Sequence, residues 1–120
     1  MTGLLDTNVA LYLLGGRMLS PLPSGSYGIS VITEMELLAW PSLTETEEDR
    51  IREFLKAVTV CELTAPIRAR AVELRKLQHL KLPDAIVCAT AMEFGVELWT
   101  NDVGLTRVPA LRCRSVNLSA

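Results

Sequence analysis

The sequence predicts an α/β fold, in which a parallel sheet of about five strands carries helices on both faces. Short apolar runs rich in β-branched residues alternate along the chain with longer segments of helical periodicity. This alternation favours parallel strands joined by helical crossovers. The length of 120 residues, of which 49% are hydrophobic, suits one compact core with little left for appendages. We therefore expect a single domain over residues 1–120.

The first predicted strand and helix lie at the N-terminus. Residues 3–6 form a short apolar run that ends in a carboxylate. Thr7 or Asn8 can then cap a helix that continues to Leu14 and ends at the following pair of glycines.

A loop, a strand and a helix are predicted next. Residues 15–26 are rich in glycine and proline, which indicates a loop. Residues 28–32 are apolar and β-branched, which predicts the second strand. Thr33 is expected to begin the next helix, which stops near Pro41.

The middle of the chain predicts a helix followed by the third strand. Thr44 and Glu47 have the spacing of a capping box, which marks a helix start. The apolar residues that follow have helical spacing, so this acidic helix lays one face on the core; they are Ile51, Phe54, Leu55 and Val58. Residues 58–63 predict the third strand.

Two further helices and two strands complete the expected order. Thr64 can cap a helix that runs to about Leu77. Pro83 opens a helix over residues 84–94 that is apolar on nearly every side, so it must be buried. The last two strands are predicted over residues 96–100 and 112–116.

Four acids are expected at one edge of this sheet. Asp6 follows the first strand and Asp102 follows the fourth. Glu36 and Asp84 lie in the first turns of two helices, one after the second strand and one leading into the fourth. Ligands of an open parallel sheet bind at the carboxyl ends of its strands, so the four side chains should gather there. Clustered carboxylates repel unless a cation is bound, and oxygen ligands suit Mg²⁺ or Mn²⁺.

Three of these acids also have purely structural explanations. Asp6 could cap the first helix. Asp84 could favour the dipole at the start of its helix. Asp102 could belong to an ordinary turn. A shared site explains all of them at once, whereas the alternatives require separate coincidences.

Glu36 has a structural alternative and a rival. It fits a capping box begun by Thr33, since such a box needs an acid three residues after the cap. Glu34 is the rival for the site, but a step of two residues turns a helix by about 200°, so only one of the two can face it.

Charge is distributed unevenly along the chain, although the net charge is only −2. Residues 34–62 contain eight acids and three bases, whereas residues 68–81 contain five bases and one acid. Arg68, Arg75 and His79 lie along one helical stripe and could contact the phosphates of a polyanion. The alternative is a solvated helix face.

The remaining features predict an ordinary interior. Cys61, Cys88 and Cys113 are widely separated in apolar contexts, so we expect buried free thiols. Zinc is not expected, because His79 is the only histidine. Trp40 and Trp99 lie near apolar runs and are expected in the core. No apolar run approaches the ~20 residues of a membrane span and no signal peptide is recognisable, so we expect a cytoplasmic protein without membrane contact.

Four segments of the chain resemble the acidic motifs of PIN domains. They are LLDTNV from Leu4, SVITEMELL from Ser30, LPDAIVCATA from Leu82 and LWTND from Leu98. They are most similar to the VapC toxins of type II toxin–antitoxin systems. The resemblance covers nearly the whole chain, with the four motifs in order.

The resemblance implies a five-stranded parallel sheet and a metal-dependent endoribonuclease. It implies metal-binding carboxylates at Asp6, Glu36, Asp84 and Asp102. It also implies hydroxyl support from Thr7 and Thr100, a small VapB-like antitoxin that blocks the active site, and a homodimer. One departure is Gly104, where many relatives carry a further acid, so the number of metal ions stays open.

The expected reaction is in-line attack of water on an RNA phosphodiester, with metal held by Asp6 and Asp102 and assisted by Asp84 and Glu36. Three alternatives remain open. The domain could serve RNA processing without a toxin role, or could be a PIN interaction module without metal. A receiver-like signalling domain is disfavoured, because the third strand ends Glu62-Leu63-Thr64 without a phospho-acceptor Asp, and no Lys follows Arg114.

Overall fold

The computed structural model describes residues 1–119 and contains one five-stranded sheet. Its strands are β1 (Gly3–Leu5), β2 (Tyr27–Ser30), β3 (Thr59–Cys61), β4 (Glu97–Trp99) and β5 (Cys113–Arg114). They pair in parallel in the order β3-β2-β1-β4-β5, so β1 lies at the centre. The predicted parallel sheet of five strands is confirmed, although each strand except β1 and β2 is shorter than expected by two or more residues.

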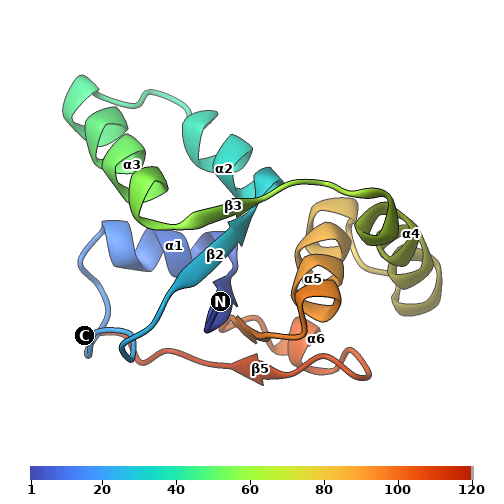
Figure 1. Cartoon of the computed structure of the whole chain (residues 1–120). Coiled ribbons are helices and arrows are strands. Elements are labelled where there is room, and N and C mark those ends of the chain that lie inside the picture. Colours follow the sequence, from blue (N-terminus) through green and yellow to red (C-terminus); the bar gives the residue numbers. More distant parts are fainter. Residues whose placement is uncertain (120) are drawn as a thin grey trace.

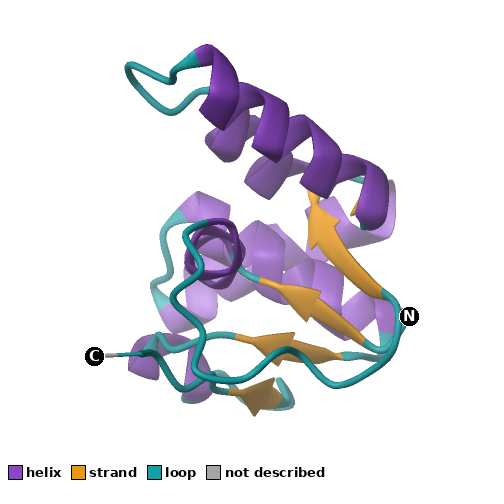
Figure 2. Cartoon of the chain, turned by 90° about the vertical axis from the view of Figure 1, so that its left-hand side faces the viewer, coloured by secondary structure: helices purple, strands orange, loops and turns teal. Residues whose placement is uncertain are grey.

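Six helices surround the sheet (Figures 1 and 2). They are α1 (Thr7–Leu14), α2 (Val31–Leu38), α3 (Glu45–Ala57), α4 (Ala65–Gln78), α5 (Leu82–Phe94) and α6 (Val103–Thr106). Figure 1 shows α4 and α5 side by side on one side of the molecule and α1 to α3 on the other. The short α6 was not predicted from the sequence. None of the helices within residues 1–119 is long and apolar enough to cross a membrane.

Neighbouring residues of the central strand point to opposite faces of the sheet. Leu4 packs with Leu98 of β4 against α4 and α5. Leu5 packs with Ile29 of β2 in a second cluster that includes side chains of α1 and α3. A strand turns alternate side chains to opposite faces, so one three-residue strand supplies both cores.

The start of α2 differs from the prediction. β2 ends at Ser30, whose side chain accepts a hydrogen bond from the backbone N–H of Ile32 at 3.1 Å. Ser30 therefore caps α2, and the helix begins two residues before Thr33. The alternative explanation of Glu36 as part of a capping box begun by Thr33 is therefore wrong, which leaves both side chains free for other contacts.

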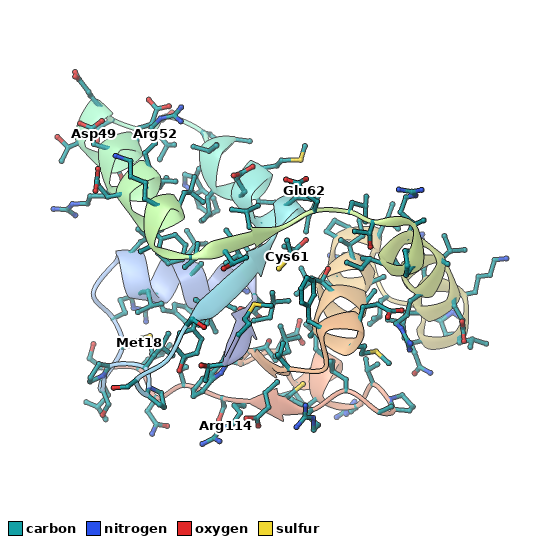
Figure 3. All side chains as sticks on the ribbon, in the orientation of Figure 1. Met18, Asp49, Arg52, Cys61, Glu62 and Arg114 are labelled. Carbon is teal, nitrogen blue, oxygen red and sulfur yellow. The ribbon has the colours of Figure 1, made fainter. Side chains whose placement is uncertain are left out.

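The acidic helix α3 has the capping box that the sequence predicted. Thr44 accepts from the backbone N–H of Glu47 at 3.1 Å, and the Glu47 carboxylate accepts from the backbone N–H of Thr44 at 3.0 Å. Ile51 is buried, whereas Asp49 and Arg52 point outward (Figure 3). The charges of this helix are thus mostly solvated.

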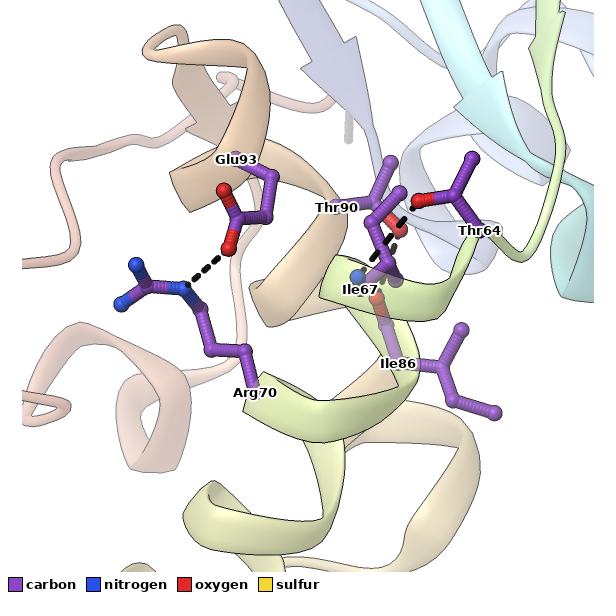
Figure 4. A network of polar contacts seen from close by, with 6 residues as sticks. All are labelled: Thr64, Ile67, Arg70, Ile86, Thr90 and Glu93. Carbon is purple, nitrogen blue, oxygen red and sulfur yellow. Dashed lines mark hydrogen bonds and ion pairs between the residues drawn. The ribbon is translucent and has the colours of Figure 1, made fainter.

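Polar contacts join α4 to α5, and others lie within the individual helices or at their starts (Figure 4). Arg70 on α4 donates to Glu93 on α5 at 3.0 Å, and the buried Thr90 hydroxyl donates to the carbonyl of Ile86 at 2.7 Å. Residues 85–91 of α5 are all buried, which confirms the prediction of a buried helix. This rigid pair holds the first turn of α5, and with it Asp84, at the edge of the sheet.

Candidate active site

The four predicted acids line one cavity at the carboxyl edge of the sheet. The structure brings together side chains from the end of β1, from α2, from the start of α5 and from the segment after β4. These are Asp6, Glu36, Asp84 and Asp102. Glu34 is not among the lining residues, so Glu36 is the acid of α2 that faces the cavity. Within the described chain, no lysine, arginine or histidine lines it.

Asp6 is the most buried of the four, with 7% of its surface exposed. Its Oδ1 accepts from the backbone N–H of Val9 at 2.7 Å, so Asp6, rather than Thr7 or Asn8, caps α1. Burial raises the pKa of Asp6, and the charges of Asp102 and Asp84 add to the rise, while hydrogen bonds from Thr100 and Val9 oppose it. Asp6 therefore caps α1 and also belongs to the acidic cluster.

Asp84 lies in the first turn of α5 and is partly buried. Burial raises its pKa, and the charges of Asp102 and Glu36 raise it further, while Lys81 lowers it. Asp84 is thus coupled electrostatically to two other acids of the cavity, which a simple helix-dipole role would not produce.

Asp102 is exposed and held by backbone contacts on both sides. Its Oδ1 accepts from the N–H of Gly104 at 2.8 Å, and its own N–H donates to the Thr100 hydroxyl at 3.0 Å. The expected turn is therefore present, and it caps α6. Thr100 is fully buried, and its hydroxyl contacts the Asp6 carboxylate and the backbone N–H of Asp102. Its supporting role in a reaction stays a prediction.

Glu36 is held by a hydroxyl rather than by its own helix. The Thr7 hydroxyl donates to Glu36 Oε1 at 2.7 Å, and the same Thr7 oxygen lies 3.0 Å from the Thr33 hydroxyl oxygen. Thr7 begins α1, whereas Glu36 is the sixth residue of α2, so the contact joins the start of one helix to the second turn of the other. The prediction that Glu36 lies in the first turn of its helix is therefore wrong, because α2 begins at Val31.

The donor set fits a hard divalent cation. Four carboxylates and a hydroxyl offer only oxygen ligands. Burial, with a further contribution from neighbouring acids, raises the pKa values of Asp6 and Asp84, so a cation would favour their ionised forms. Among residues 1–119, no three Asp, Glu, His or Cys side chains are close enough to form a ready-made cage. Mg²⁺ does not require one, because it usually keeps several waters and binds one or two carboxylates.

The predicted basic stripe does not reach the cavity. Arg68 Nη1 donates to the carbonyl of Leu63 at 3.0 Å, and Arg75 Nη1 donates to the carbonyl of Leu80 at 2.6 Å. Both arginines are exposed, and each links α4 to the backbone just outside one end of the helix. The positive charge of Lys81 lowers the pKa of Asp84. Sequence reasoning did not single out Lys81, although it stands three residues before Asp84.

The position predicted for Trp40 is also wrong. It is 53% exposed and lines the acidic cavity, so the expectation of core packing is wrong. Its position at the end of α2, directly before Pro41, was a signal that the chain leaves the core there. Trp99 is buried as expected, with the Arg114 guanidinium stacked over its ring.

The cysteines are free, as the sequence predicted. Cys61 and Cys88 are buried, and Cys113 is partly exposed. Burial raises the pKa of Cys88 to about 12, so this thiol stays neutral and takes part in packing rather than chemistry.

Comparison with known proteins agrees with this arrangement. The family model described as PIN domain matches residues 3–111. The chain belongs to the PIN domain family. The resemblance noted in the sequence is thereby confirmed, and the receiver-like alternative is excluded. A comparison with curated protein sequences found no significant match.

Solved structures of toxin–antitoxin complexes contain similar chains. A toxin–antitoxin complex from Klebsiella pneumoniae has a chain with 33% identity and a TM-score of 0.79, over 92% of this PIN domain and 95% of that chain. DNA-bound VapBC from Salmonella typhimurium gives 19% identity and a TM-score of 0.80, over 96% and 98%. A chain of VapBC-1 from nontypeable Haemophilus influenzae has 24% identity and a TM-score of 0.75, over 96% of this PIN domain and 98% of that chain. The last two show the shared fold.

Proposed function

We propose that this PIN domain is a Mg²⁺- or Mn²⁺-dependent endoribonuclease and the toxin of a type II toxin–antitoxin pair. The observation that carries the proposal is the convergence of Asp6, Glu36, Asp84 and Asp102, from four separate segments, on one cavity. Such a cluster is costly for a fold to keep without a cation. Family membership and the 33% identity to a chain of a toxin–antitoxin complex support the biological role.

In the proposed reaction, Asp6 and Asp102 hold the cation and Asp84 and Glu36 assist. A bound Mg²⁺ would lower the pKa of a water molecule and stabilise charge that develops on the phosphate oxygens. No protein base is then essential, which agrees with the absence of histidine from the cavity lining within residues 1–119.

The protein contributes positioning. The bond from Val9 N–H fixes one oxygen of Asp6, and the bond from Gly104 N–H fixes one oxygen of Asp102. Each carboxylate therefore keeps its orientation before substrate arrives, which lowers the reorganisation needed for reaction. Leu11, Val87 and Leu105 form the apolar part of the cavity lining beside the acids.

A neighbouring groove supports an antitoxin as partner. It is lined mainly by apolar side chains of α1, α2 and α3 and of the segment that joins α2 to α3. Leu11 and Trp40 line both this groove and the acidic cavity. An apolar helix or strand seated there, followed by a basic side chain, would reach the acids and block them. The expected homodimer stays a prediction, supported by exposed apolar residues on α4 and α5 such as Leu77 and Phe94.

Cleavage by matched variants tests the enzymatic part. Glu36→Gln should lower the rate of RNA cleavage in Mg²⁺ by ~10²-fold, because it removes a charge that faces the cavity. Glu34→Gln changes the same residue type on the same helix, outside the lining residues, and should leave the rate within about twofold. Excess EDTA should abolish wild-type cleavage. Equal rates for the two variants would contradict the assignment of Glu36.

Growth tests the toxin role. Induction of the wild-type chain alone should arrest growth, and co-expression with the short protein encoded beside it should restore growth and yield. Healthy growth combined with RNA cleavage in vitro would favour the alternative of an RNA-processing enzyme. Absence of both cleavage and metal binding would favour an interaction module.

A further inference from the structure

Thr33 has a buried hydroxyl that the helix does not use. Its side chain is fully buried at the third position of α2. Ser30 already caps this helix, so Thr33 is not needed there. A buried hydroxyl costs stability unless it finds a hydrogen-bond partner. Within residues 1–119, its side-chain partner is Thr7, with 3.0 Å between the two hydroxyl oxygens.

The three side chains Thr33, Thr7 and Glu36 form a chain of hydrogen bonds with a defined direction. Thr7 has one hydroxyl hydrogen, which it donates to Glu36 Oε1 at 2.7 Å. An ionised carboxylate can only accept. The hydrogen between the two threonines must therefore come from Thr33, so the direction runs from Thr33 to Thr7 to Glu36.

We propose that Thr33 is a positioning residue, which fixes the orientation of Glu36 by holding the Thr7 hydroxyl. The inference rests on the proposed function only in its consequence for catalysis. A threonine hydroxyl in a helix has more than one accessible rotamer. The bond donated by Thr33 favours the Thr7 rotamer that places its hydroxyl oxygen beside both Thr33 and Glu36, and it leaves the Thr7 hydrogen for Glu36. Successive hydrogen bonds in a chain also strengthen one another.

Glu36 needs such support because little else restrains it. It is exposed and lies on the outer part of α2, and a glutamate has three rotatable side-chain bonds. Among described residues, its carboxylate has no other hydrogen bond than the one from Thr7. We call the hydrogen bonds from Thr33 to Thr7 and from Thr7 to Glu36 the relay. Thr33 is buried in the interior, so the relay restrains an acid at the cavity mouth by linking it to the core.

The relay can be tested without activity. Thr33→Val keeps shape and removes the donor, whereas Thr33→Ser keeps the hydroxyl. Three-bond couplings measured by NMR on the metal-free protein report the Thr7 side-chain rotamer. We expect one rotamer in wild type and in Thr33→Ser, and averaged couplings in Thr33→Val. An unchanged single rotamer in Thr33→Val overturns the relay.

The catalytic consequence is tested by cleavage and by Mn²⁺ titration. Thr33→Val should lower kcat by about fivefold to tenfold with little change in KM for RNA, and should weaken Mn²⁺ binding, while Thr33→Ser should return both to within about twofold of wild type. Combined with Glu36→Gln, Thr33→Val should add no further loss, because it acts through Glu36. An additive loss would make Thr33 merely structural.

A second variant covers the case in which Thr33→Val folds poorly. Thr7→Val breaks the same relay at its middle and should produce the same loss, which does not add to that of Glu36→Gln. Independent losses overturn the proposal. If the wild type neither cuts RNA nor binds Mn²⁺, the proposed function fails. The NMR measurement of the Thr7 rotamer would still test whether Thr33 orients Thr7.

Discussion

Asp6 shows that a capping residue and a site residue can be the same side chain. Its Oδ1 accepts the N–H of Val9 and caps α1, and the same carboxylate lines the acidic cavity. Burial raises the pKa of Asp6, and Asp102 and Asp84 raise it further, whereas the hydrogen bond from Val9 N–H lowers it and so stabilises the carboxylate. The structural and functional explanations considered for this residue are therefore not exclusive.

Asp84→Asn should abolish cleavage while leaving the metal-free protein equally or more stable. The amide keeps the shape of the side chain and removes one charge from a repelling cluster. Wild type should gain thermal stability when Mg²⁺ or Mn²⁺ is added, because an ion that binds only the folded state stabilises it, and the variant should gain less. Thermal melts with and without metal, beside a cleavage assay, measure both effects.

Asp49→Asn is the matched control for Asp84→Asn. Asp49 is an exposed acid on the outer face of α3 (Figure 3), so its loss should change neither cleavage nor the shift produced by metal. If Asp84→Asn melted several degrees lower without metal and cut RNA at the wild-type rate, Asp84 would be a helix-terminus residue and no part of the site.

At the scale of elements, the order of strands and helices followed from the sequence and the helix starts did so only in part. Thr44 and Thr64 cap α3 and α4 as predicted, since each precedes a clear periodic pattern. At α2, Ser30 and Thr33 are both good caps, and the periodicity cannot choose between them. The choice depends on where β2 stops pairing with β3, which is a tertiary property.

Ser30→Ala should destabilise the protein by about 1 kcal/mol and also lower cleavage by the folded protein, because it loosens the first turn of the helix that carries Glu36. Thr44→Ala removes the cap of α3 and should cost a similar free energy of unfolding without changing cleavage. Urea unfolding and initial rates distinguish the two. Equal rates for both variants would show that the cap of α2 has no bearing on the site.

Reversing Arg68 and Arg75 to Glu should weaken RNA binding and flatten its dependence on salt if α4 contacts phosphates, by about one unit of slope per lost contact. Each guanidinium has one nitrogen bonded to a backbone carbonyl, which leaves others free for RNA. Arg52→Glu with Lys56→Glu makes the same charge change on α3. If both pairs give the same slope as wild type, the stripe is ordinary solvated surface.

At the scale of the whole molecule, metal-free stability should depend on pH through the cavity. The pKa values of Asp6 and Asp84 are raised on folding, chiefly by burial. A raised pKa contributes stability that is fully present below the unfolded value and is lost as pH rises through the folded value. In EDTA, the melting temperature should therefore rise as pH falls from neutrality towards the ordinary aspartate pKa of about 4.

Asp84→Asn should show a weaker rise over the same pH range, and saturating Mn²⁺ should reduce the rise in wild type, since the ion compensates the charges. Melting curves in EDTA and in Mn²⁺ at matched ionic strength are sufficient. A metal-free protein that becomes less stable on acidification over this range would contradict the account of a strained acidic cluster.

The topology explains why the four acids could be predicted together and their surroundings could not. Parallel strands end at the same edge, so acids placed after β1 and β4 or at helix starts must converge whatever the side-chain details. Thr33, Trp40 and Lys81 reach the cavity or act on it through the packing of α2 and the turn before α5. Local sequence patterns do not encode such contacts.

Calorimetric titration of the metal-free protein with Mn²⁺ tests the central claim most directly. The account predicts measurable binding to wild type and to Glu34→Gln, and binding weakened by tenfold or more in each of Asp6→Asn, Asp84→Asn and Asp102→Asn, because the three acids belong to one cavity. Equal Mn²⁺ affinity in wild type and all three Asn variants, with each variant folded, would contradict it.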